Sequence, residues 1–174
     1  MKKSFTELED QGLKWVKVRS SKQRYELRTA EDEVLGSITR SNWTSRAEVE
    51  APGNHWVFER KGIFRQRVII RSGGTGEEPA EYIYQSSSGR LIYPDWRVFL
   101  WKQDNFWGTK WVWMTEDGQP LIGFQTSGFL KVQGEINITP DLADEKAPSL
   151  LIFLGWYLYT LYQDDSTVAV VVAT

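Results

Sequence analysis

The sequence predicts a mainly β fold: a closed antiparallel barrel of about twelve strands around a hydrophobic helix near the C-terminus. Short runs of alternating apolar and polar residues recur up to about residue 138, separated by Gly, Asp, Asn and Ser. This pattern is typical of half-buried strands joined by short turns. The run 150–162 is apolar on every side of a helix and therefore requires burial all round. A closed barrel hides the strand edges and encloses such a helix.

Each predicted strand is bounded by turn-forming residues. The Asp117-Gly118 pair separates two of the runs and is a strong hairpin signal. The glycine-rich segment 72–79 has no periodicity and predicts a surface loop. A barrel of about twelve strands is too wide for its own side chains to fill, so the helix would occupy its interior. In chain order, the predicted strands are 14–19, 24–29, 34–40, 46–51, 55–60, 63–71, 80–85, 90–93, 97–103, 110–115, 120–126 and 130–138.

The predicted helix covers about residues 148–163. Its thirteen-residue apolar run, 150–162, spans about 20 Å as a helix, whereas a bilayer core needs about 30 Å. Gln163, Asp164 and Asp165 end the run. These features favour a buried core helix, with a membrane tail anchor as the alternative. Residues 166–174 fit either a last strand or an extension of the helix.

The length of 174 residues predicts one domain over residues 1–174. Residues 1–11 are basic and then acidic with no apolar run behind them, so we expect a flexible segment and no secretory signal. We expect a cytoplasmic location, peripheral at a membrane. The absence of Cys excludes thiolate zinc sites and cysteine nucleophiles, and a single His excludes a histidine pair. A net charge of −2 argues against a dedicated nucleic-acid binder.

The hairpins around Gly36 and Gly118, followed by the hydrophobic run 150–162 near the end of a strand-rich chain, resemble the tubby C-terminal-like superfamily. That superfamily includes the phospholipid scramblases, the LURP-one-related proteins and many short bacterial proteins, and this chain is similar to a small bacterial-type member. The resemblance covers about residues 12–163. It implies a barrel of about twelve strands with a central hydrophobic helix. It also implies a ligand class, because tubby proteins bind phosphoinositides through basic residues on the barrel.

The sequence contains no recognisable catalytic set. His55 is the only histidine and has no identifiable serine and acid partners, and no Gly-x-Ser-x-Gly elbow occurs. The glycine-rich segment 72–76 is followed by Glu77 and Glu78, which would repel a phosphate. We therefore expect no enzymatic activity and no cofactor. A hydrolase that uses two carboxylates is the enzymatic alternative.

Three carboxylates, Asp141, Asp144 and Glu145, precede the predicted helix. They suit the positive N-terminus of a helix. Calcium is the alternative, since it prefers oxygen ligands. Their spacing does not match an EF-hand loop, so we expect no bound metal.

A basic segment is the first candidate binding site. In the predicted strand 63–71, Arg65, Arg67 and Arg71 share one face. The other face, Phe64, Val68 and Ile70, would point to the core. Guanidinium groups in a row could bind an anion such as a phosphorylated headgroup, although a solvated outer face is the alternative. The candidate anion-binding residues are Arg60, Lys61, Arg65, Arg67 and Arg71.

Clustered tryptophans are the second candidate. Five lie between residues 96 and 113, and Trp107, Trp111 and Trp113 could stack against a ligand. Packing against the central helix is the alternative for most of them, and Trp107, beside Asp104, Asn105 and Gly108, is the one we expect to be exposed.

Together these features predict a non-enzymatic binding or scaffold domain. Its partner would be an acidic phospholipid headgroup at a membrane surface, or a protein; no nucleic acid is expected. The alternative is a barrel that binds a hydrophobic or carbohydrate ligand through the Trp-rich region 96–113.

Overall fold

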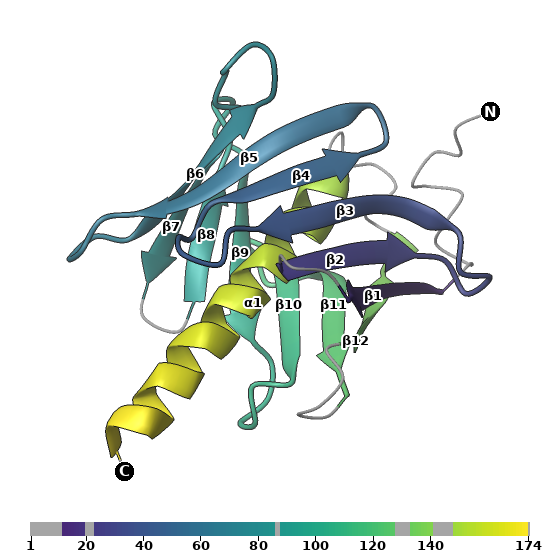
Figure 1. Cartoon of the computed structure of the whole chain (residues 1–174). Helices are drawn as coiled ribbons and strands as arrows, with labels where there is room; N and C mark the ends of the chain where they lie inside the picture. The colour runs from purple at the N-terminus through teal and green to yellow at the C-terminus, as the bar shows by residue number, and fades with distance from the viewer. Residues whose placement is uncertain (1–11, 20–22, 86–87, 128–132, 141–147, 174) are drawn as a thin grey trace.

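The computed structural model is a closed barrel of twelve antiparallel strands with one helix passing through its middle (Figure 1). This confirms the predicted fold class. The structure describes residues 12–19, 23–85, 88–127, 133–140 and 148–173, and the strand and helix counts refer to these. The strands are β1 (Leu13–Val18), β2 (Gln23–Arg28), β3 (Val34–Arg40), β4 (Ala47–Ala51), β5 (Asn54–Lys61), β6 (Arg67–Ser72), β7 (Glu81–Gln85), β8 (Ser88–Ile92), β9 (Val98–Gln103), β10 (Lys110–Thr115), β11 (Pro120–Thr126) and β12 (Gln133–Ile138).

Each strand pairs with the strands before and after it in the chain, and β1 pairs with β12 to close the barrel. Closure leaves no unpaired edge, which removes the usual route to edge-to-edge aggregation. Alternate side chains point inward, as the period-2 pattern requires. In β4, Ala47 and Val49 are fully buried, whereas Glu48 and Glu50 are exposed.

The helix α1 (Pro148–Ala173) fills the barrel with its apolar part, since every residue from 150 to 161 is buried. Trp156 stacks on Trp15 of β1 with ring centroids 5.5 Å apart. It also lies against Gly134 of β12, where a Cβ atom would come within 2.2 Å of the Trp156 ring. Trp113 of β10 donates its indole N–H to the Leu151 carbonyl at 2.8 Å. Large aromatic rings therefore fill the space between helix and wall.

The helix is longer than predicted. It continues beyond residue 163 to Ala173, and residues 164–173, called the helix tail below, leave the barrel (Figure 1). Residues 166–173 therefore extend the helix and do not form a last strand. Among the described residues, no helix is both long enough and apolar enough to cross a membrane. The N-terminal segment 1–11 lies outside the described residues.

One strand begins later than predicted. β6 starts at Arg67, and residues 62–66 form the turn that connects it to β5. Gly62 has a φ of +93°, and a Cβ atom there would come within 2.3 Å of the Arg65 carbonyl oxygen. This tight turn removes Phe64 from the strand, so the prediction that Phe64 faces the core is wrong: its side chain is 98% exposed.

The barrel has two ends of different construction. The connections β1–β2, β3–β4, β5–β6, β7–β8, β9–β10 and β11–β12 surround the end where the helix tail leaves, called the helix-exit end. The remaining connections surround the opposite end, where the helix begins. This division follows from the antiparallel order and places consecutive turns at alternate ends.

Candidate functional site

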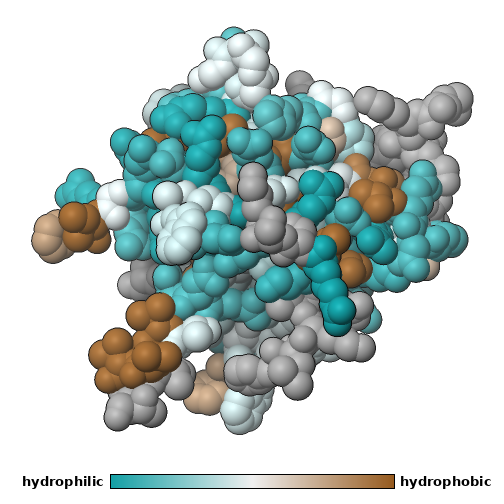
Figure 2. Space-filling model, in the orientation of Figure 1, coloured by the Kyte–Doolittle hydropathy of each residue, from teal (hydrophilic) through white to brown (hydrophobic). Residues whose placement is uncertain are grey.

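Exposed apolar side chains gather at the helix-exit end. Of the ten large apolar residues that are exposed among the described residues, only Val34 and Trp96 lie at the opposite end. Figure 2 shows such side chains at the tip of the β5–β6 turn and along the helix tail. Scattered apolar residues are common on protein surfaces, but their concentration at one end makes that end the candidate interaction surface. The eight at the helix-exit end, called the apolar tips below, are Trp43, Ile63, Phe64, Phe106, Trp107, Val168, Val171 and Val172.

The β9–β10 loop holds two of the apolar tips outward. The Asn105 side-chain oxygen accepts hydrogen bonds from the backbone N–H groups of Thr109 and Lys110, each at 3.0 Å. Its amide donates to the Thr109 hydroxyl at 2.7 Å. Phe106 and Trp107 follow directly and pack edge to face, with ring centroids 5.5 Å apart. The loop is internally bonded, so the exposure of these two rings is a built feature.

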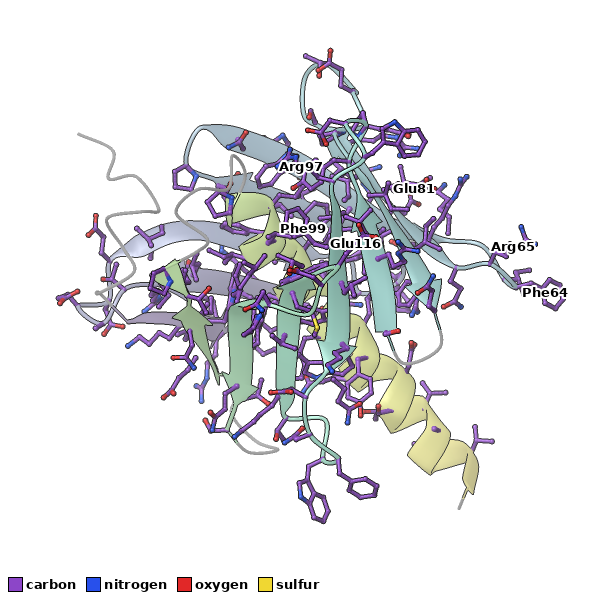
Figure 3. All side chains as sticks on the ribbon, turned by 180° about the vertical axis from the view of Figure 1, so that it is seen from behind. Phe64, Arg65, Glu81, Arg97, Phe99 and Glu116 are labelled. Atoms are coloured by element: carbon purple, nitrogen blue, oxygen red, sulfur yellow. The ribbon has the colours of Figure 1, made fainter. Side chains whose placement is uncertain are left out.

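Two other turns present apolar side chains in the same way. Ile63 and Phe64 stand at the apex of the β5–β6 turn, and Figure 3 shows Phe64 and Arg65 projecting away from the barrel. Trp43 lies in the β3–β4 turn and is 94% exposed. Its backbone N–H donates to the Ser41 hydroxyl at 3.2 Å, a local bond that fixes the turn.

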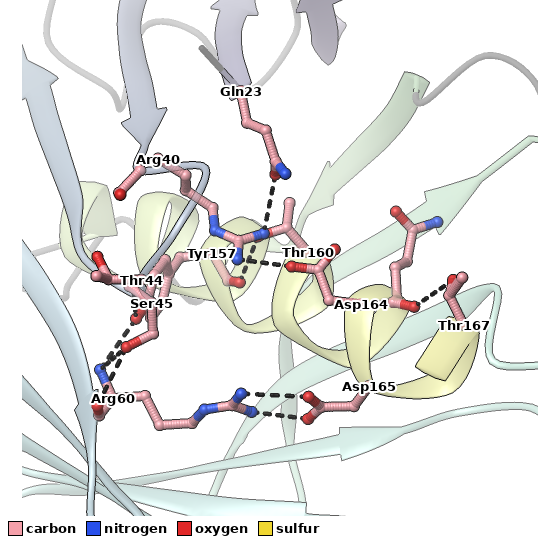
Figure 4. A network of polar contacts seen from close by, with 12 residues as sticks. Gln23, Arg40, Thr44, Ser45, Arg60, Tyr157, Thr160, Asp164, Asp165 and Thr167 are labelled. Atoms are coloured by element: carbon pink, nitrogen blue, oxygen red, sulfur yellow. Dashed lines mark hydrogen bonds and ion pairs between the residues drawn. The ribbon is translucent and has the colours of Figure 1, made fainter. Parts of the chain in front are cut away.

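Two ion pairs fix the direction in which the helix tail leaves the barrel (Figure 4). The Arg40 guanidinium, at the end of β3, donates to the Asp164 carboxylate at 2.7 Å. Arg60 of β5 donates to both oxygens of Asp165, at 2.7 and 3.2 Å. The Asp165 carboxylate also raises the pKa of Arg60.

A buried phenol anchors the same region about two turns earlier in the helix. The Tyr157 hydroxyl donates to the Ser45 carbonyl oxygen at 2.6 Å and accepts from the Arg60 backbone N–H at 3.2 Å. It therefore ties the helix to β5 and to the β3–β4 turn. Burial raises the pKa of Tyr157, so this hydroxyl remains a donor at neutral pH.

Charge is distributed unequally between the two ends. The described connecting residues at the helix-exit end carry one acidic side chain, Asp104, and three basic ones, Arg19, Arg46 and Arg65. Those at the opposite end carry one basic side chain, Arg97, against eight acidic ones. The two helix-tail carboxylates, Asp164 and Asp165, are each paired with an arginine. The eight acidic residues are Glu31, Asp32, Glu33, Glu77, Glu78, Asp95, Glu116 and Asp117.

The predicted anion-binding residues do not form one free basic face. Arg60 is paired with Asp165. Ion pairs also join Lys61 to Glu59, Arg67 to Glu81, and Arg71 to Glu59 and Glu78, at 3.1 to 3.8 Å. Arg65 lies in the β5–β6 turn and has no ion-pair partner among the described residues, so the prediction that it shares a strand face with Arg67 and Arg71 is wrong. Of the five, Arg65 is the one whose charge is available at the helix-exit end.

The three predicted stacking tryptophans separate into two groups. Trp107 is 80% exposed, as expected. Trp113 is fully buried against the helix and bonded to it, and Trp111 is buried in a stack with Trp101 whose ring centroids are 5.4 Å apart. The prediction that an external ligand stacks on Trp113 is therefore wrong, whereas Trp111 lines a small cavity between the helix and the barrel wall.

Sequence reasoning missed six of the eight apolar tips and misplaced Phe64 in the core. A signal was present for the turns: Trp43, Ile63 and Phe106 each directly follow a Gly or Asn, residues that favour turns. The helix tail gave its own signal in the spacing of Val168, Val171 and Val172, which is one helical stripe.

The described residues contain no group of three or more His, Cys, Asp or Glu side chains arranged to hold a metal ion. The carboxylates at 141, 144 and 145, considered above for calcium, lie outside the described residues. His55 is exposed at the opposite end of the barrel, on β5.

Comparison of the chain with protein-family models, with curated proteins and with solved structures gives no significant match.

Proposed function

We propose that this protein is a non-enzymatic binding domain that docks on an anionic lipid surface through its helix-exit end. The observation that carries the proposal is the placement of eight of the ten exposed large apolar side chains, among the described residues, at that one end. Keeping such side chains in water is unfavourable by about 25 cal/mol for each Å² of apolar area, so insertion into a lipid interface stabilises the bound state.

A lipid surface fits the arrangement of the apolar tips better than a protein partner does. The tips come from three separate turns and from the helix tail, which stand apart from one another (Figures 1 and 3). Protein interfaces require a contiguous, shape-complementary patch, whereas a deformable lipid surface accepts separate points of insertion. Trp and Phe are also the side chains that favour the boundary between headgroups and acyl chains.

The charge distribution favours an anionic surface and one orientation on it. Docking through the helix-exit end places Arg19, Arg46 and Arg65 near the headgroups, where each basic side chain contributes about 1 kcal/mol. The eight acidic residues of the opposite end then lie farthest from the negative surface. The reverse orientation would bring these carboxylates against anionic headgroups.

The tubby-like resemblance and a cytoplasmic, membrane-peripheral location stay expectations that agree with this proposal. No comparison supports them independently. In the proposed arrangement the lipid contact is made by apolar tips assisted by basic side chains. It does not depend on the paired residues Arg67 and Arg71 of the barrel wall.

Vesicle co-sedimentation tests the proposal with a matched pair of variants. Trp107 and Trp96 are both exposed tryptophans in strand-connecting loops, at opposite ends of the barrel. We expect the native protein to sediment with vesicles that contain phosphatidylserine, and to do so more weakly at high salt. Because partial burial of one large ring is worth about 1.5 kcal/mol, Trp107→Asn should weaken binding about tenfold, and Trp96→Asn should leave it unchanged.

A double variant sharpens the test. Phe64→Ser combined with Trp107→Asn removes tips from two different turns, so the losses should add because the sites are far apart. Equal binding by all variants, or equal loss for Trp96→Asn, contradicts the proposal. So does the absence of vesicle binding by the native protein, the outcome expected if the tips instead contact a protein.

A further inference from the structure

A small cavity opens at the helix-exit end, beside the apolar tips. It has a volume of about 160 Å³ and lies between the last buried turns of α1 and the wall from β7 to β10. Its apolar lining is Tyr82, Trp101, Trp111, Leu158 and Tyr162. A protein cavity of about 150 Å³ holds one benzene molecule, so this space suits one ring or a short alkyl chain.

The walls of the cavity are fixed by close packing. A Cβ atom at Gly89 would come within 2.0 Å of the Tyr82 hydroxyl, and one at Gly108 within 2.4 Å of the Tyr162 hydroxyl. These two glycines therefore allow the Tyr82 ring to approach β8 closely and the Tyr162 ring to approach the β9–β10 loop closely. Trp111 is held by its indole N–H, which donates to the Gly108 carbonyl at 3.1 Å. The space is thus a consequence of the fold and does not depend on loose side chains.

One polar group in the lining lacks a hydrogen-bond acceptor. The Tyr84 hydroxyl is buried and donates to no group within the part of the chain that the structure describes, and the nearby Arg60 guanidinium can only donate to it. Burial raises the pKa of Tyr84 to about 12, although the charge of Arg60 opposes this, so the hydroxyl is neutral and can donate. A buried donor without an acceptor is unfavourable, and a ligand oxygen would supply the missing acceptor.

The charges around the cavity exclude an ionic ligand. Asp165 is the charged residue in its lining, and the Arg60 guanidinium already holds both oxygens of this carboxylate. No positively charged side chain lines the space among the described residues. An anion would meet the carboxylate, and a cation would compete with Arg60.

We propose that this cavity is a binding site for one uncharged apolar group that carries a hydrogen-bond acceptor, such as an aryl ketone or an ester-linked short acyl chain. The apolar part fills the space between Trp101, Trp111 and Leu158, and the acceptor oxygen takes the hydrogen bond of Tyr84. The site is separate from the docking surface proposed above, because binding to it requires no membrane.

NMR titration in the absence of vesicles tests the site with toluene, acetophenone and benzoate as probes. These have similar rings and differ in having no acceptor, a neutral acceptor and a charged one. We expect the indole N–H signals of Trp101 and Trp111 to shift with acetophenone, less with toluene and not with benzoate. Tyr84→Phe should weaken acetophenone about three- to tenfold and leave toluene unchanged, because it removes one hydrogen bond.

Two control variants keep the result interpretable. Tyr25→Phe makes the same chemical change at a buried tyrosine outside the cavity and should have no effect on either probe. Ser88→Phe places a ring in the cavity from its rim and should abolish the shifts, provided that circular dichroism shows an intact fold. A short-chain phosphatidylcholine below its micelle concentration tests whether the bound apolar group belongs to a lipid or to a free small molecule. If this lipid shifts the indole signals and Ser88→Phe abolishes those shifts, the group belongs to a lipid. If acetophenone alone shifts the signals, the ligand is a free small molecule.

The proposal is overturned if no probe shifts the two indole signals, if benzoate binds as tightly as acetophenone, or if Tyr84→Phe weakens toluene and acetophenone equally. None of these outcomes bears on vesicle binding, so the site and the docking surface can fail separately.

Discussion

Gly155, in the middle of the buried helix, gives the sharpest test of how the helix sits in the barrel. A Cβ atom at this position would come within 2.6 Å of the Phe124 ring and 2.7 Å of the Trp113 indole nitrogen. In an exposed helix, Gly→Ala is stabilising by about 1 kcal/mol. Here the added methyl must displace one of two buried rings, and such overpacking costs about 1–3 kcal/mol.

Movement of Trp113 would have a second cost. Its indole N–H donates to the Leu151 carbonyl at 2.8 Å, and losing a buried hydrogen bond is worth about 1 kcal/mol. The sum of these effects is a net loss of about 1–3 kcal/mol for Gly155→Ala. For a domain of this length, that lowers the melting temperature by about 2–12 °C.

Thermal unfolding followed by circular dichroism measures this change. Thr167→Ala, at an exposed position of the helix tail, is the control, because it raises helix propensity away from the barrel wall and should leave the melting temperature equal or slightly higher. A higher melting temperature for Gly155→Ala would refute the reasoning, since it would show that residue 155 does not lie against the barrel wall.

Three further predictions concern the polar contacts of the same region. Asp164→Asn should lower the free energy of unfolding, measured with urea, by about 1–3 kcal/mol, because Arg40 is 4% exposed and would keep a buried charge without its partner. This loss is smaller than that for a fully buried ion pair, since Asp164 is half exposed. Arg40→Met should be close to neutral, because it removes the charge and fills the space; a larger loss than for Asp164→Asn would contradict this asymmetry. Burial raises the pKa values of Tyr84 and Tyr157, so the folded state holds their protons more tightly than the unfolded state does. The free energy of unfolding should therefore be at its full value below about pH 10 and fall as the pH rises toward about 12. Urea midpoints that stay constant over this range would contradict the prediction.

The barrel and its helix could be predicted because both follow from patterns local to the chain. Alternation along segments such as Ala47–Ala51 sets which side chains face inward, and the all-apolar run 150–162 requires enclosure. These patterns do not fix the residue at which a strand ends and a turn begins. The segment 63–71 reads as one strand, and only the close backbone approach at Gly62 shows that it begins as a turn.

The candidate site was harder to predict because it depends on which turns share an end of the barrel. Phe64 and Phe106 lie 42 positions apart in the sequence, and only the closed topology places both at the helix-exit end. The basic residues were conspicuous in the sequence, but their partners were not: Arg60 meets Asp165, which follows it by more than one hundred residues. Long-range pairing of this kind leaves no periodic signal.

The central claim is that the helix-exit end, and not the opposite end, meets an anionic lipid surface. Because the sequence has no cysteine, a single labelling site can be introduced at either end without altering native residues elsewhere. Thr44→Cys lies beside Trp43 at the helix-exit end, and Gln119→Cys lies in the exposed β10–β11 turn at the opposite end. Each is labelled with an environment-sensitive NBD fluorophore and mixed with phosphatidylserine-containing vesicles. The account predicts a blue shift and increased emission for the label at residue 44 and none at residue 119; the reverse pattern, or no change at either position, would contradict it.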